Sequence, residues 1–114
     1  AGNRLRKLYS VSDEGRKALQ EKLLTLLSEP EHIRWQVDIG TYNSDLLPKG
    51  AVVESLLKYR EALEKKAACY DELLAFLKSI GCPVHRYAIA TRPVFLLKGE
   101  IEWIDTYVKE LKGE

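Results

Sequence analysis

Hydrophobic residues recur at helical intervals along most of this chain. After Ser12, whose hydroxyl can cap a helix, Asp13 and Glu14 place two carboxylates where a helix carries its positive end. Leucines then recur on one helical face until Pro30 interrupts the pattern. Because proline lacks an N–H group and restricts the residue before it, we expect this first helix to span residues 13–28.

The clearest periodicity follows the Leu47-Pro48 pair and stops at Gly81. It alternates steps of three and four residues without a break, at Val53, Leu56, Arg60, Leu63, Ala67, Tyr70, Leu74 and Leu77. This heptad seam predicts a helix over residues 48–80, roughly 50 Å long at 1.5 Å per residue. Such a rod is too long for a compact core, so we expect a second copy of the chain to cover part of its apolar face.

A second heptad seam runs through the C-terminal segment, at Val94, Leu97, Ile101, Ile104, Val108 and Leu111. Leu96, Trp103 and Tyr107 form another apolar stripe beside it. We expect Pro93 to kink or divide this helix and Gly99 to weaken it. The two seams together predict an all-α fold, a long helical hairpin preceded by shorter helices.

Two segments are less regular. Residues 31–46 fit neither period: Val37-Asp38-Ile39 alternates as a strand does, but Pro30 suits a helix start, and a helix is the preferred interpretation. Gly40 would lie on its apolar face, either to admit a neighbouring helix or as a weak point. Residues 4–11 alternate basic or polar with apolar side chains and predict a short edge strand.

The composition places few constraints on function. The chain has 114 residues, of which 46% are hydrophobic, and a formal net charge of +1, which gives no overall attraction to nucleic acid or membranes. It contains neither a run of about 20 apolar residues nor a signal peptide, so we expect a cytoplasmic protein. It also contains no methionine, so we expect a fragment of a longer protein.

The sequence offers no constellation for catalysis. Cys69, Cys82 and His85 supply three metal-ligand side chains without a fourth at a zinc spacing, so we expect inert thiols and no metal or cofactor. A nucleophile motif, a phosphate-binding glycine loop and the HExxH pattern are all missing. We therefore expect a protein that is not an enzyme.

Three motifs carry a family resemblance. Arg6 to Gly15 (RKLYSVSDEG) is similar to the second wing strand and following helix of winged helix-turn-helix domains, a motif that several regulator families share. Leu46-Leu47-Pro48 then opens a long helix rich in Leu, Glu and Lys, and Glu100-Ile101-Glu102-Trp103 marks the last helix. In this order the motifs resemble the PadR family of transcriptional regulators, in the form with a virulence-activator-type C-terminal domain. The sequence departs from that pattern at Thr91-Arg92-Pro93, where the family usually runs as an uninterrupted helix.

The resemblance implies the organisation of the chain. Residues 1–28 would be the end of a winged-helix DNA-binding domain, and residues 29–114 a helical dimerisation and effector domain. Family members are homodimeric bacterial regulators, usually repressors, and some respond to phenolic or other aromatic compounds. Arg4, Arg6 and Lys7 would then contact DNA phosphates, which positions a protein on DNA without reading its sequence. The recognition helix is not in this chain, so most of the DNA-binding domain would lie upstream.

The expected site residues fall into two sets. The dimer interface is predicted at Leu56, Leu63, Tyr70, Leu97, Ile101, Ile104, Val108 and Leu111, and a candidate pocket for an aromatic effector at Trp103, Tyr107, Trp35 and Arg92. The alternative for the aromatic residues is simple packing. The alternative for the whole chain is a helical hairpin that docks a partner protein and has no regulatory role.

Overall fold

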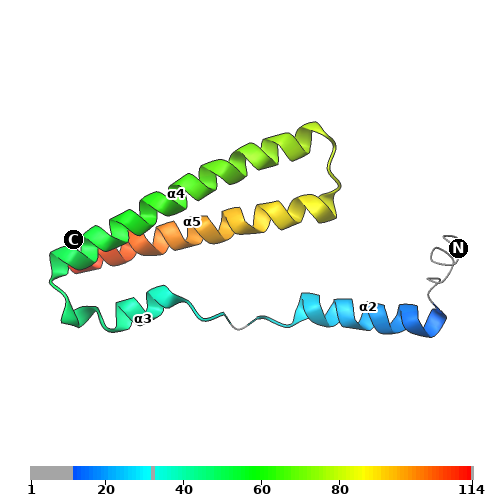
Figure 1. The fold of residues 1–114 in the computed structure, drawn as a ribbon, viewed down its shortest axis with the longest axis horizontal. Helices are drawn as coiled ribbons and strands as arrows, with labels where there is room; N and C mark the ends of the chain where they lie inside the picture. Colours follow the sequence, from blue (N-terminus) through cyan, green and yellow to red (C-terminus); the bar gives the residue numbers. More distant parts are fainter. Residues whose placement is uncertain (1–11, 32, 114) are drawn as a thin grey trace, which may run out of the picture. The chain divides into compact units, whose positions relative to one another are not determined.

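The computed structural model describes residues 12–31 and 33–113. Its elements are α2 (Asp13–Ser28), α3 (Gln36–Tyr42), the short 3-10 helix η1 (Ser44–Leu46), α4 (Lys49–Ser79) and α5 (Val84–Lys112) (Figure 1). No strand occurs among the described residues, and the predicted all-α fold class is confirmed. The edge strand expected over residues 4–11, and with it Arg4, Arg6 and Lys7, lies outside them.

The chain divides into two units, Ala1–Asp38 and Ile39–Glu114. The first contains α2, whose bounds are those predicted from the sequence. The Gly15 N–H donates to the Ser12 hydroxyl at 3.1 Å, so the cap forms as expected. None of the α2 residues is buried, and even Leu23, the least exposed of its large apolar residues, is 47% exposed. The α2 leucines are therefore not covered by the rest of this unit.

The prediction of one helix over residues 31–46 is wrong in its length. The structure forms only α3 and then η1, and Glu31 and Ile33–Trp35 are not helical. The segment combines Ile33, Val37 and Ile39 with Gly40, which all have lower helix propensity than leucine or alanine. No atom lies within 4 Å of the position a Gly40 Cβ would take, so this glycine admits no close neighbour in the described structure.

The second unit is dominated by α4 and α5, which run antiparallel and lie side by side (Figure 1). The long hairpin predicted from the two heptad seams is therefore confirmed. The helix α4 ends at Ser79, and two residues later Gly81 has a φ of 68°, which is open to glycine and strained for other residues. The Cys82 N–H reaches the Leu77 carbonyl at 3.0 Å, and the Gly81 N–H reaches the Lys78 carbonyl at 3.1 Å. This pair of bonds closes the end of α4 and reverses the chain within four residues.

Pro93 was expected to kink or divide the last helix; division is wrong, and a kink stays a prediction. The α-helix α5 continues from Val84 to Lys112 with Pro93 inside it. Buried neighbours explain this continuity, because Ala90 and Val94, on either side of Pro93, both pack with 7% exposure. Packing of this face holds the helix together where the proline removes one backbone hydrogen bond.

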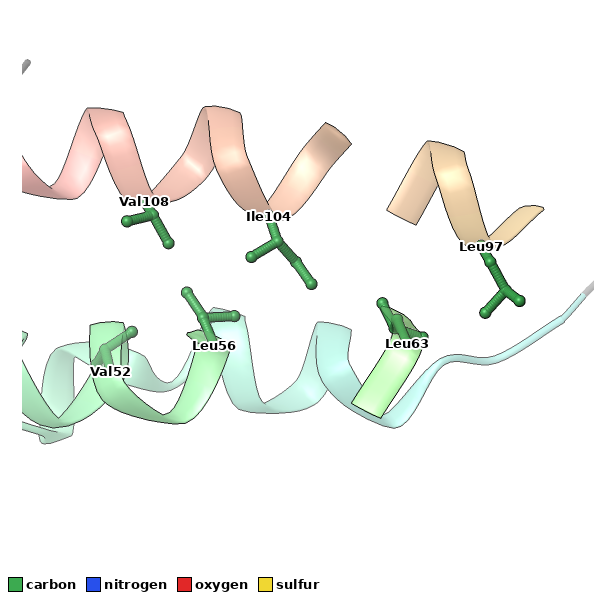
Figure 2. Close-up of a cluster of buried hydrophobic side chains, with 6 residues drawn as sticks. All are labelled: Val52, Leu56, Leu63, Leu97, Ile104 and Val108. Carbon is green, nitrogen blue, oxygen red and sulfur yellow. The ribbon is translucent and has the colours of Figure 1, made fainter. Parts of the chain in front are cut away.

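The hairpin core is a single apolar row between α4 and α5. Figure 2 shows its members pointing toward one another from the two helices: Val52, Leu56, Leu63, Leu97, Ile104 and Val108. Ile104 is the most enclosed, with 0% exposure, and half-buried side chains such as Tyr59 and Ile101 flank the row. The core is therefore narrow and has no polar member.

Candidate functional site: the two faces of the helical hairpin

The residues predicted to form a dimer interface lie inside one chain. Of these eight, Leu56, Leu63, Leu97, Ile104 and Val108 are buried in the hairpin core, and Tyr70, Ile101 and Leu111 pack against it half-buried. The expectation rested on a monomer leaving the α5 seam in water, and that premise does not hold. The seams of α4 and α5 cover each other, because two antiparallel helices can satisfy the same heptad pattern that two chains would. Most of this seam is therefore covered without a second copy, and the dimer interface at these residues stays a prediction.

One polar contact marks a first side of the core row. The Tyr59 hydroxyl on α4 donates to Glu100 Oε2 on α5 at 2.8 Å. Burial, and then the hydrogen bond to Glu100, raise the pKa of Tyr59 to about 12. Tyr59 therefore remains a neutral donor throughout the physiological range, and this bond tethers the two helices.

A second polar contact marks the opposite side. The Arg60 guanidinium bonds both oxygens of Asp105, with Nε to Oδ1 at 2.7 Å and Nη2 to Oδ2 at 3.2 Å, and also pairs with Glu64. The hydrogen bond to Arg60 holds the pKa of Asp105 below its ordinary value of 3.8. A forked pair of this kind fixes both the distance and the orientation of the helices.

Replacing Asp105 with asparagine is expected to reduce the stability of the hairpin and to flatten its response to acid. Because the folded-state pKa is lowered, the stabilisation is present above the ordinary value of 3.8 and is lost as the pH falls through the folded-state value. Urea unfolding of parent and Asp105→Asn at pH 7, 5 and 3 measures the difference. Glu61→Gln, which removes an exposed pair with Lys65, is the matched control. Equal losses in the parent and Asp105→Asn between pH 5 and 3 would refute the assignment.

The two contacts divide the surface of the hairpin into two faces. At 3.6 residues per turn, Ile89, Leu96 and Trp103 lie within about 60° of Glu100 around α5, on the side away from Asp105. Leu73 and Phe76 on α4, and Ile80 at its C-cap, lie within about 100° of Tyr59, away from Arg60. We call these six residues the apolar face. The Arg60 and Asp105 side, which also carries Glu64, Lys98, Glu102 and Lys109, is the charged face.

The candidate effector residues are only partly brought together. Trp103 and Tyr107 stack, with ring centroids 5.4 Å apart and an angle of 19° between the planes. Arg92 lies eleven residues before Trp103 on the same helix, about 16 Å along its axis, too far for one small ring to touch both. Trp35 belongs to the other unit. A hollow of about 290 Å³ does lie on α5, but on the charged face, lined by Lys98, Ile101, Glu102, Asp105, Thr106 and Lys109.

Other chemistry is sparse. Cys69 is exposed and Cys82 half-buried, both as free thiols. Within residues 12–31 and 33–113, no group of three or more metal-ligating side chains comes together. In that same part of the chain, none of the helices has the length and apolar content to cross a membrane.

The polar contacts between α4 and α5 were largely unpredictable from the sequence. Arg60 occupies a position in an otherwise apolar seam, and that anomaly was the available signal for a buried or half-buried partner. Glu100 and Asp105 carried no comparable signal, because acidic residues are common on helix surfaces. No protein-family model matches the chain, and no curated protein or solved structure matches it either.

Proposed function

We propose that this chain is the dimerisation portion of a PadR-like DNA-binding transcriptional regulator, most of whose winged-helix domain lies upstream. The observation that supports it best is the order of the elements. The helix α2 begins at Asp13, within the wing-like motif, and α4 begins directly after Leu46-Leu47-Pro48. The motif Glu100-Ile101-Glu102-Trp103 lies in α5, the antiparallel partner of α4.

In this proposal the hairpin joins two DNA-binding domains and does not read DNA itself. Symmetric regulators place two recognition elements on successive turns of the duplex, which requires a rigid connection between the copies. A hairpin with an apolar core and two polar tethers supplies that rigidity. An aromatic effector, where one exists, would bind beside the stacked rings of Trp103 and Tyr107, where the final helix meets its dimer mate.

The second candidate is a hairpin that docks an unrelated partner protein. The observation in its favour is the apolar face, since interaction modules present such a stripe at helical spacing. The regulator proposal requires a helix-turn-helix pattern within roughly 60–80 residues upstream of Asn3 in the coding sequence. An interaction module requires none, so an upstream sequence without that pattern would decide against the regulator.

The regulator proposal predicts how DNA binding depends on length. The chain alone should bind duplex DNA weakly, with strong salt dependence and no preference between sequences, because no recognition helix is included. In the longer protein, Arg6→Ala should weaken binding to every duplex by a similar factor, since a phosphate contact carries no base information. Fluorescence anisotropy at several salt concentrations measures both. Lys98→Ala, on the charged face of the hairpin, is the control and should change neither quantity.

Two results would contradict this prediction. Sequence-selective binding by the chain alone at physiological salt would place recognition in these residues. An Arg6→Ala change that weakens binding to one duplex only would make Arg6 a base-reading residue instead of a phosphate contact.

A further inference from the structure

The apolar face leaves a large surface exposed to water. Its six residues, Leu73, Phe76, Ile80, Ile89, Leu96 and Trp103, are between 40% and 74% exposed. Side chains of this size with such exposure leave roughly 600 Å² of apolar surface, at the upper end of what a monomer carries. Each partner in a specific interface of standard size buries about 800 Å². The apolar face and its margin therefore reach the size that a stable dimer needs.

The spacing on this face suits another helical hairpin. Ile89, Leu96 and Trp103 repeat every seven residues on α5. On the other helix the same spacing joins Leu73 to Ile80 at the C-cap of α4, and the exposed Lys66 holds the preceding position of that series. A seven-residue repeat keeps its side chains in line with a neighbouring helix over several turns, which is the packing found in four-helix bundles. The partner must consequently be long, helical and apolar along one side.

The face is also complementary to itself in side-chain size. Because Tyr59 bonds to Glu100, Trp103 lies near the level of Ser55 on α4, where the same face carries the small residues Ser55 and Ala62. In a symmetric pair whose two-fold axis runs along the hairpin, α4 of one copy crosses α5 of the other. The large Trp103 ring then meets the partner's small residues, and the same contact occurs twice.

We infer that a second copy of this chain covers the apolar face, so that two hairpins form a four-helix bundle through Leu73, Phe76, Ile80, Ile89, Leu96 and Trp103. The inference rests on the dimer in the proposed function and adds the surface through which it forms. The core seam stays within each chain, and the charged face remains in solvent on the outside of the bundle.

Charge substitutions in the full chain test this surface. Leu73→Glu and, separately, Ile89→Glu should raise the dimer dissociation constant about 100-fold, because each buries an unpaired carboxylate. Sedimentation equilibrium measures the constant, and circular dichroism verifies that the hairpin stays helical. Ala75→Glu adds the same charge two residues from Leu73 but toward the charged face, and should leave the constant unchanged. Leu23→Glu on α2 should also leave it unchanged.

Cys69 provides an independent readout, because it is exposed and lies on the α4 side of the apolar face. In a Cys82→Ser background, its reaction with a thiol reagent should slow at least tenfold between micromolar protein and several hundred micromolar. Leu73→Glu should abolish that concentration dependence, and Ala75→Glu should retain it.

The outcomes separate the surface from the dimer. A parent chain that remains monomeric at several hundred micromolar overturns both. A dimer unaffected by Leu73→Glu and Ile89→Glu, with Cys69 equally reactive at all concentrations, leaves the dimer standing and overturns the surface. If Leu23→Glu alone dissociates the dimer, the interface belongs to the α2 leucines, and the proposed surface is overturned.

Discussion

Replacing Ile104 with aspartate is expected to unfold the hairpin, and Ile104→Ala is expected to destabilise it by about 3 kcal/mol. The side chain is 0% exposed and lies between α4 and α5 among leucine and valine side chains (Figure 2). Alanine leaves a cavity in a narrow core, and aspartate places a carboxylate where none of the described residues offers a buried polar partner. The cost of the charge, about 4 kcal/mol or more, approaches the whole stability of a small domain.

Urea unfolding followed by circular dichroism measures these losses. Val84→Ala is the control, because Val84 is a branched apolar residue of the same helix with 84% exposure that lies outside the apolar face, and its loss should stay below about 0.5 kcal/mol. An Ile104→Asp protein that is folded but monomeric would show that this residue stabilises contacts between copies, and would restore the seam as the dimer interface. An Ile104→Ala loss below about 1 kcal/mol would contradict the described core.

Replacing Pro93 with alanine is expected to stabilise the hairpin by about 2 kcal/mol. Proline in a helix interior costs about 3 kcal/mol relative to alanine, because it lacks the N–H that would reach the carbonyl four residues earlier and its ring crowds that carbonyl. Part of this gain is offset, since proline also restricts the unfolded chain. The expected result is a higher urea midpoint with an unchanged slope.

The matched control is Ala88→Pro, which would create a second interruption in the same helix and should destabilise it by a comparable amount. A Pro93→Ala protein no more stable than the parent would indicate that α5 is already distorted at this point, as the sequence pattern predicted.

Local signals predicted the ends of helices well. The bounds of α2 follow from Ser12 and Pro30, and those of α4 from Pro48 and Gly81, because caps and proline act on the residues beside them. The prediction for the segment after Pro30 was wrong because that segment has no comparable local signal. Its weak helix formers leave the extent of α3 to packing, which a single sequence does not reveal.

The dimer interface shows a deeper ambiguity. A heptad seam indicates that a helix packs against another helix, but it does not indicate whether that second helix belongs to the same chain. The size argument assigned Ile104 and Leu97 to a contact with a second copy, and in the described structure they pack against α4 of the same chain. The hairpin connection decided the matter, since a four-residue loop makes α5 the nearest surface available to α4.

The polar contacts between α4 and α5 have a consequence for alignment. The apolar seam repeats every seven residues, so a hairpin shifted by one repeat would again place leucine opposite leucine and valine, with a longer loop. The apolar row alone would therefore give only a small free-energy difference between the observed hairpin and one shifted by a repeat. The bonds of Tyr59 to Glu100 and of Arg60 to Asp105 form at one offset only, and a shift of one repeat separates both by about 10 Å. These two polar contacts therefore select one register of α4 against α5 among the several that apolar contacts alone would permit.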